Sequence, residues 1–207
     1  MRRNEAWLVV LWLVTAVLAV PVPVSAADSR PQLGSDWSPT RDRFYVHDKH
    51  HYGSPWFTGA HRKMIPYGCT RAPFYPPSSR CEGDRGFHHG LDIAMRCGNR
   101  LDAGMAGRVV QPRSPGALGS AYGRHAFRLR NFRHDVDIVI GHTRRVFVSP
   151  GDRVQRGQRI ARASDAGSPD GCHLHFEARP VAGGYLDAVR PGPYLRLTRR
   201  SKRTRST

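Results

Sequence analysis

The sequence predicts an all-β fold made of antiparallel strands, and three observations carry the prediction. Past Cys81 the chain breaks into short apolar runs rich in β-branched residues, separated by Gly and Pro at short intervals. No helical periodicity is sustained outside the first 26 residues. A length of 207 residues allows one domain with a real core plus short extensions.

The N-terminus, "MRRNEAWLVVLWLVTAVLAVPVPVSAAD", has a basic start, an apolar run and small residues before Asp28. This layout predicts a secretory signal peptide over residues 1–26, cleaved after Ala26. An uncleaved membrane anchor is the alternative, since the run is near the lower length limit for a span. Pro21 and Pro23 favour cleavage. We therefore expect a secreted protein, extracellular or in the cell wall, with no later transmembrane segment.

Residues 27–63 are polar and show no clear period, which predicts a short irregular lead-in that packs at most locally. Its His47, His50 and His51 are expected to be surface histidines in a loop. The core domain is expected over residues 64–197. Residues 198–207 are rich in basic residues without apolar periodicity and predict a disordered basic tail.

The expected strands of the core domain share β-branched or alternating apolar residues between turn residues. In chain order they are "GLDIAM", "AGRVVQP", "HAFRLRN", "VDIVIGHT", "RVFVSPGDRV", "QRIARAS" and "CHLHFEARP".

Four cysteines in an exported chain favour two disulfide bonds. Cys69 and Cys81 bracket the Pro-rich segment "CTRAPFYPPSSRC" and are expected to pair, which leaves Cys97 for Cys172. Three pairings are open in principle, and a cysteine-ligated metal is the competing use. The chain has no CxxC motif, which weakens the metal alternative.

The formal net charge of +17 predicts affinity for polyanions. The predicted signal peptide contributes only +1 of it, from Arg2 and Arg3 against Glu5. An exported protein meets anionic wall polymers and lipid head groups before nucleic acid. We therefore expect anionic cell-wall polymers, and not nucleic acid, as partners.

The run "DGCHLHFEARP" places two histidines one residue apart in a strand-like segment. Alternate residues of a strand share a face, so His173, His175 and Glu177 should lie together opposite Leu174 and Phe176. Such a face suits a metal or proton-transfer site. A half-buried strand with two solvated imidazoles is the structural alternative.

Three further segments add to this pattern. "GFHHGLDIA" carries His88 and Asp92 on either side of a glycine, and "DIVIGHTRRV" ends an apolar strand at His142. "SPGDRVQRGQRIARASD" predicts a Gly-punctuated hairpin, although its turn also resembles that of lipoyl and biotinyl carrier domains. Each histidine alone could be a loop or strand-end residue.

In this order, "HHGLDIA", "AGRVV", "IGH", "GDRVQRGQRIA" and "GCHLHFE" resemble the lysostaphin-like, LytM-type family of zinc metallopeptidases, which cut peptide cross-links of bacterial peptidoglycan. The similarity runs from about Phe87 to Leu195. The lead-in "HRKMIPYGCTRAPFYPPSSRC" is not part of the general family pattern.

The resemblance implies that His88, Asp92 and His175 are metal ligands and that His142 and His173 are the catalytic histidines. His89 falls on the variable position of HxGxD. No motif position is lost, whereas degenerate members of the family lack ligands and act without hydrolysis.

Elementary chemistry agrees with this assignment. Two imidazoles and one carboxylate suit Zn²⁺ and leave a fourth position for water. One free histidine could take a proton from the water and the other steady an oxyanion, with Glu177 orienting an imidazole. The predicted function is a secreted zinc endopeptidase acting on peptidoglycan, in a groove lined by the zinc site. The alternatives are a non-catalytic wall-binding or hydrolase-regulating protein of the same fold, and a polyanion-binding protein whose basic tail is the function.

Overall fold

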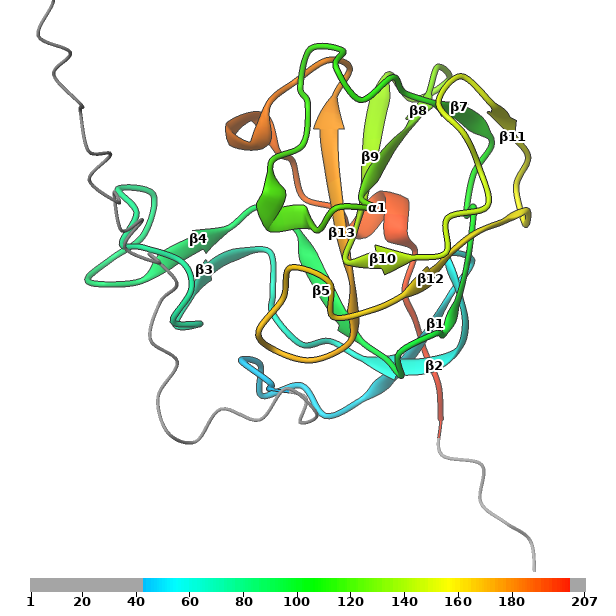
Figure 1. The fold of residues 1–207 in the computed structure, drawn as a ribbon. Coiled ribbons are helices and arrows are strands. Elements are labelled where there is room, and N and C mark those ends of the chain that lie inside the picture. Colours follow the sequence, from blue (N-terminus) through cyan, green and yellow to red (C-terminus); the bar gives the residue numbers. More distant parts are fainter. Residues whose placement is uncertain (1–42, 202–207) are drawn as a thin grey trace, which may run out of the picture. The chain divides into compact units, whose positions relative to one another are not determined.

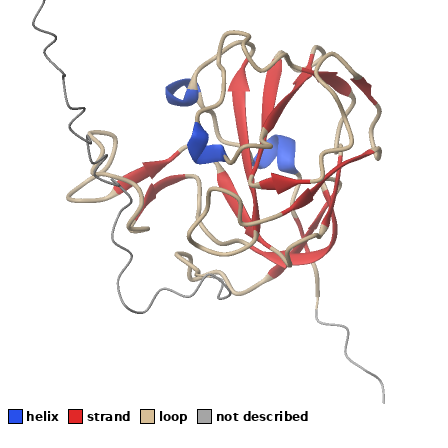
Figure 2. Ribbon diagram, in the orientation of Figure 1, coloured by secondary structure: helices blue, strands red, loops and turns tan. Residues whose placement is uncertain are grey.

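Two six-stranded antiparallel sheets form most of the structure, a computed structural model that describes residues 43–201 (Figure 1). The predicted signal peptide and the end of the predicted basic tail lie outside the described residues. Within residues 43–201 the helices are α1 (Gly192–Leu195) and the 3-10 turns η1 (Ser120–Tyr122) and η2 (Tyr185–Asp187), as Figure 2 shows. The predicted all-β antiparallel fold is therefore confirmed.

We call the sheet that contains the HxH strand the central sheet. Its long strands β9 and β13 lie side by side over six paired positions. In spatial order its strands are β11 (Arg153–Val154), β7 (Gly107–Val109), β8 (Phe127–Asn131), β9 (Val136–Gly141), β13 (His173–Pro180) and β5 (Leu91–Ala94).

We call the second six-stranded sheet the flanking sheet. In spatial order its strands are β10 (Thr143–Arg144), β12 (Arg159–Ala163), β6 (Arg100–Asp102), β2 (Phe57–Arg62), β1 (His51–Ser54) and β14 (Thr198–Arg199). A separate two-stranded sheet pairs β3 (Gly68–Thr70) with β4 (Gly86–His88) and projects to one side in Figure 1.

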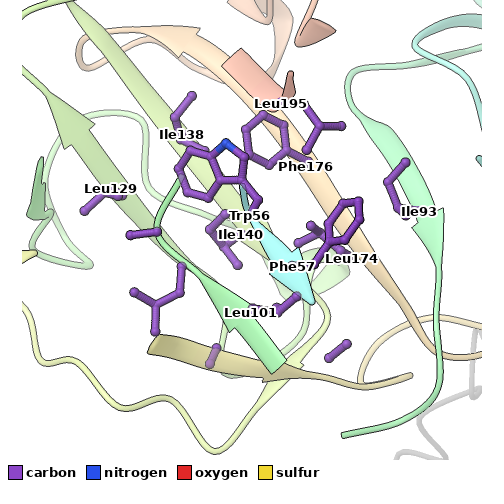
Figure 3. Packing of buried hydrophobic residues seen from close by; sticks show 14 of the residues in the cluster. Trp56, Phe57, Ile93, Leu101, Leu129, Ile138, Ile140, Leu174, Phe176 and Leu195 are labelled. Atoms are coloured by element: carbon purple, nitrogen blue, oxygen red, sulfur yellow. The ribbon is translucent and has the colours of Figure 1, made fainter. Parts of the chain in front are cut away.

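The core lies between the apolar faces of the two six-stranded sheets (Figure 3). Trp56 is its largest buried side chain; its ring meets Phe176 of β13 edge-on at 4.9 Å and its Nε1 donates to the Tyr194 carbonyl at 2.9 Å. Leu174 and Phe176 point into this core, which leaves the odd-numbered residues of β13 on the opposite face. The alternation expected for this strand is confirmed.

The lead-in differs from the sequence prediction. Residues 51–62, expected to be irregular, form the hairpin β1–β2 inside the flanking sheet, and Trp56 in its turn fills the centre of the core. β14 pairs with β1, so the chain is still part of the sheet at Thr198 and Arg199, where the basic tail was expected to begin. The hairpin forms because the large Trp56 side chain is buried between the two sheets, and this places β1 and β2 in the flanking sheet.

One predicted strand does not form over its whole length. "RVFVSPGDRV" yields only β11 at its end, while Val146 and Val148 pack against the core without joining a strand. Phe147 donates its N–H to the Ile160 carbonyl at 2.8 Å, which ties this segment to the flanking sheet.

Both expected disulfides are present. Cys69 and Cys81 have Cα atoms 5.6 Å apart and close the loop between β3 and β4. Cys97 and Cys172, 5.1 Å apart at Cα, join the segment after β5 to the residue before β13. None of the helices within residues 43–201 is long and apolar enough to cross a membrane.

Trp56→Ala should lower the free energy of unfolding by about 3–5 kcal/mol, because a fully buried indole would leave a cavity between the sheets. Denaturant unfolding followed by circular dichroism measures the change. The control Phe132→Ala removes an aromatic ring that is 66% exposed, and it should change stability by less than about 0.5 kcal/mol. Equal losses in the two variants would contradict the assigned core.

Candidate metal centre

The pairing of β13 with its neighbours brings the sequence-predicted ligands together. His175 lies opposite Asp92 of β5 on one side and opposite Gly141 of β9 on the other. Side chains at directly opposed positions share a face of the sheet. His175 Nδ1 and Asp92 Oδ1 are accordingly 2.9 Å apart, on the face away from the core.

His88 joins this pair from the end of β4. Its Nε2 lies 3.2 Å from His175 Nδ1 and 3.4 Å from Asp92 Oδ1. One donor atom from each of the three residues falls within 4.8 Å of the others, and all three residues are buried. The three residues predicted as ligands therefore form a compact donor set of two imidazoles and one carboxylate.

The glycine inside "HHGLD" is explained by the His175 ring. A Cβ on Gly90 would come within 2.5 Å of His175 Cε1 and 3.0 Å of the Phe176 carbonyl oxygen. A Cβ on Gly141, on the other flank, would meet His175 Cβ at 3.0 Å. The His175 side chain thus occupies a space that only glycine neighbours leave open.

Hydrogen bonds fix which ring nitrogen of each proposed ligand is free. His88 Nδ1 is 2.9 Å from the Pro66 carbonyl, which can only accept, so Nδ1 carries the proton and Nε2 keeps its lone pair. His175 Nε2 lies 3.3 Å from Glu177 Oε2, which leaves Nδ1 to face the donor set. Glu177 thus orients the His175 imidazole, as the strand alternation predicted.

The electrostatics of the donor set favour a cation. Burial alone would raise the pKa of Asp92, but His88, His173 and His175 hold it well below its usual range. Burial likewise opposes charge on His175, yet Asp92 and Glu177 raise its pKa to about 9. Two carboxylates directed at one imidazole therefore favour positive charge at this point.

His142 lies at the corner where the chain leaves the central sheet for the flanking sheet. Its φ of +50° is unusual for a residue with a Cβ. Its N–H donates to the Tyr122 carbonyl at 2.8 Å, and its own carbonyl accepts from the Ser164 N–H at 2.8 Å. These bonds hold the strained backbone in place.

The His142 ring is also fixed. Its Nδ1 donates to the Ala166 carbonyl at 2.8 Å, which leaves Nε2 unprotonated. Burial, followed by the neighbouring His173 and His175, lowers the pKa of His142 to about 3. His142 is therefore a neutral imidazole, with its ring centre 4.5 Å from that of His173 and 5.9 Å from that of His175.

His173 is held in the same manner. Its Nδ1 donates to the Gly171 carbonyl at 2.9 Å, and burial lowers its pKa despite the nearby Asp92. Its buried Nε2 has no hydrogen-bond partner in the described part of the chain and lies 3.6 Å from Asp92 Oδ2. A buried basic nitrogen without a partner is expected where a ligand or a reacting group completes the site.

Two site residues were not predicted from the sequence. Arg179 Nε donates to Glu177 Oε1 at 2.5 Å, and its Nη2 donates to the Tyr122 hydroxyl at 2.7 Å. Tyr122 donates to Glu177 Oε2 at 3.0 Å and packs edge-on against the His175 ring. Arg179 continues the alternation of the HxH strand, so the strand pattern could have identified it. Tyr122 lies in the 3-10 turn η1, and no sequence pattern points to it.

The donor set opens into a surface groove of about 740 Å³. His88, His142 and His175 are among its lining residues. The disulfide-closed segment from Phe74 to Arg80 also lines it, as do Tyr185 and Leu186. The candidate site therefore lies at a groove, as predicted.

Four other histidines considered in the sequence analysis are not part of the donor set. The His89 ring packs between Phe87 and Tyr185, with centroid distances of 5.1 and 5.0 Å. His47, His50 and His51 are exposed. A second group, Cys97, Asp165 and Cys172, has metal-ligand spacing, but its two sulfurs are joined to each other.

Residues 86–188, about half of the chain, match the model of Peptidase family M23. The chain belongs to this family. Members of family M23 are metallopeptidases, typically zinc-dependent, and the matched range contains every residue of the donor set as well as His142 and His173. The family predicted from the sequence is therefore confirmed.

Solved structures show the same fold. The catalytic domain of the antimicrobial peptidase lysostaphin from Staphylococcus simulans is 24% identical with a TM-score of 0.52, covering 66% of this chain and 92% of that one. LytU is 25% identical with a TM-score of 0.53, covering 67% of this chain and 86% of that one. A point mutant of the catalytic domain of the prophage-encoded M23 protein EnpA from Enterococcus faecalis is 25% identical, with a TM-score of 0.51 and coverages of 68% and 96%. The chain therefore has the same lysostaphin-like fold as these three solved structures.

Gly90→Ala should weaken zinc binding by about ten- to a hundredfold, because the new methyl group would displace the His175 ring from the donor set. Gly119→Ala is the matched control, since a Cβ there meets nothing within 4 Å. Competition with a chromophoric chelator measures both affinities. Equal zinc affinity in the two variants would show that the His175 ring position is unimportant for the metal.

Proposed function

We propose that this protein is a secreted zinc-dependent endopeptidase that hydrolyses peptide cross-links or stem peptides of bacterial peptidoglycan. The observation that carries the proposal is the pairing of a complete three-residue donor set with two further imidazoles. Each of the two, His142 and His173, keeps an unprotonated Nε2 because its Nδ1 donates to a backbone carbonyl. Family membership supports a peptidoglycan-related hydrolase.

The donor set fits zinc. His88 Nε2, Asp92 Oδ1 and His175 Nδ1 converge, and each imidazole has its other nitrogen held by a carbonyl or carboxylate. Nitrogen and oxygen donors in a set of three match catalytic zinc sites, which keep one position for water. Zinc bound there would act as a Lewis acid that lowers the pKa of a water from 15.7 to about 7 and polarises a carbonyl.

The two free histidines then divide the proton work. A general base must be neutral at working pH, and burial keeps the pKa of both His142 and His173 low. One accepts the proton of the attacking water at its free Nε2 and returns it to the leaving amine. The other can stabilise charge on the carbonyl oxygen once its Nε2 carries a proton. The hydrogen bonds from each Nδ1 to a backbone carbonyl hold both imidazole rings in place, so neither ring has to reorient during the reaction.

The groove suits a peptide substrate. Its lining includes aromatic, proline and aliphatic side chains together with His88, His175 and His142. Such a surface can hold an extended peptide against the site and exclude water around the scissile bond. The solved peptidase lysostaphin and the M23 protein EnpA share this fold.

The remaining features fit action outside the cell. The predicted signal peptide would export the chain, and the two disulfides would persist in an oxidising compartment. The charge of +17 would attract anionic wall polymers. We accordingly place the mature protein in the extracellular space or the cell wall.

His142→Ala and His173→Ala should each keep zinc but lower turnover of peptidoglycan by about two to four orders of magnitude, because each removes a proton-transfer or oxyanion group. Digestion of purified peptidoglycan, with mass analysis of released fragments and counting of new amino termini, measures turnover and identifies the bond. His88→Ala, Asp92→Ala and His175→Ala are the comparison set and should lose both zinc and activity.

The result for the unmodified protein decides between enzyme and scaffold. If the zinc-loaded protein released no amino termini from peptidoglycans of several cross-link chemistries while still binding them, a wall-binding or hydrolase-regulating role would replace the proposal.

A further inference from the structure

The outer face of the central sheet, opposite the core, carries a row of charged residues that crosses five strands. The pairing register sets Arg153 of β11 opposite Arg108 of β7, Arg108 opposite Arg130 of β8, and Arg130 opposite Asp137 of β9. Asp137 is in turn opposite Arg179 of β13. The row therefore ends on the same strand and the same face as His175.

The arginines in the middle of this row are paired with carboxylates or other protein groups. Arg130 holds Asp137 with two bonds, Nε to Oδ1 at 2.7 Å and Nη2 to Oδ2 at 2.9 Å. Buried Arg128 approaches the same carboxylate at 3.4 Å. Arg179 is satisfied by Glu177 and Tyr122. These arginines have structural partners and need no ligand.

The β7–β11 end of the row is different. Arg108 and Arg153 are exposed, directly opposed and without an ion pair to any acid in residues 43–201. The recorded bond of the Arg108 side chain is from Nη1 to the Gly151 carbonyl at 3.3 Å. Like charges placed opposite each other destabilise a sheet. An anion between them would relieve the repulsion.

Two surface hollows surround this arginine pair. A hollow of about 490 Å³ is lined by Arg108, Arg153, Arg133 and Phe132 among others. A neighbouring hollow of about 230 Å³ shares Arg108 and Phe132 and adds Arg130. Phe132 is 66% exposed, the largest exposed fraction among the large apolar side chains recorded as exposed. The surface thus combines several guanidinium groups with one apolar ring face.

We propose that this arginine surface, Arg108, Arg153, Arg133 and Phe132, is a docking site for a phosphate-bearing polymer of the cell wall. The oxygens of a tetrahedral phosphate point in different directions, so guanidinium groups on two neighbouring strands can each reach one. A carboxylate can also accept from two guanidinium groups, as Asp137 does from Arg130 and Arg128, so the experiment below includes a polycarboxylate. Phe132 would pack against the apolar face of a sugar or polyol unit between phosphates.

The arginine surface lies on the same sheet as the proposed metal site but away from it. β7 is three strands from β13, which is about 14 Å across the sheet at about 4.8 Å per strand. The row meets β13 at Arg179, about 13 Å along the strand from His175, so about 20 Å separates Arg108 from the proposed metal site. Figure 1 shows β7 and β11 at the far end of the sheet from β5. A wall polymer held there would keep the groove near the wall without entering it.

The flanking sheet provides a matched control. Arg144 of β10 is opposite Arg162 of β12, which repeats the cross-strand arginine pair on a different sheet. Arg108→Gln/Arg153→Gln and Arg144→Gln/Arg162→Gln each remove two positive charges from opposed strand positions. The two double variants therefore differ in place and not in charge.

The experiment measures binding of the full-length chain to immobilised long-chain polyphosphate over a range of salt concentrations. Arg108→Gln/Arg153→Gln should weaken binding about tenfold or more and flatten its salt dependence, since charge-assisted bonds to phosphate are lost. The flanking-sheet control should bind within about threefold of the unmodified protein, because Arg144 and half-buried Arg162 act on a polymer held elsewhere only through a screened field. Phe132→Ala should weaken binding to a phosphate polymer containing sugar or polyol units and leave polyphosphate binding unchanged.

Three outcomes would overturn the proposal. Equal losses in the two double variants would show that net charge alone attracts the polymer. Binding to a polycarboxylate, poly-glutamate, as tight as that to polyphosphate would remove the phosphate assignment. If Arg108→Gln/Arg153→Gln lost binding to anionic lipid vesicles but bound polyphosphate as tightly as the unmodified protein, the surface would be assigned to membranes. His175→Ala should bind polyphosphate like the unmodified protein, so this test is independent of the proposed peptidase activity.

Discussion

The site depends on the antiparallel register of β13 between β9 and β5. This register sets His175 opposite Asp92 and next to Gly141, and so brings a donor pair together from residues 83 positions apart. A shift of one residue would turn the whole HxH face into the core and send Leu174 and Phe176 outward. The disulfide between Cys97 and Cys172 holds the two strands together at one end, directly before His173, and reinforces the register.

Backbone carbonyl groups complete what the register begins. The carbonyl groups of Pro66, Ala166 and Gly171 each accept a hydrogen bond from one Nδ1, so the lone pair of His88, His142 and His173 is on Nε2. Main-chain acceptors fix tautomers at little conformational cost because the surrounding loops already hold them. His175 differs, since its Nε2 faces Glu177 and its Nδ1 lies 2.9 Å from Asp92 Oδ1, where a bound metal would take the place of a proton. The Arg179 and Tyr122 contacts to Glu177 then stabilise a carboxylate that would otherwise be costly to bury.

Much of this centre could be predicted from the sequence, because strand alternation and motif order bear directly on it. The HxH face and the role of Glu177 follow from strand alternation, and the set of His88, Asp92 and His175 was implied by the resemblance to the lysostaphin-like family. The carbonyl acceptors could not be predicted, since they come from loops and any residue type offers one. The β1–β2 hairpin was missed for another reason: Thr58, Gly59 and Ala60 are exposed, so β2 shows no apolar alternation, and a single buried Trp56 anchors it.

X-ray absorption at the zinc edge of the purified protein tests the central claim most directly. The proposed ligands predict a first shell of nitrogen and oxygen at about 2.0–2.2 Å, with the outer-shell signal of two imidazoles and no sulfur. Zinc held by cysteine thiolates, the competing use of the four cysteines, would instead place sulfur at about 2.3 Å. A sulfur shell, or the scattering of fewer than two imidazoles, would contradict the claim that the residues brought together by the β13 register hold the zinc.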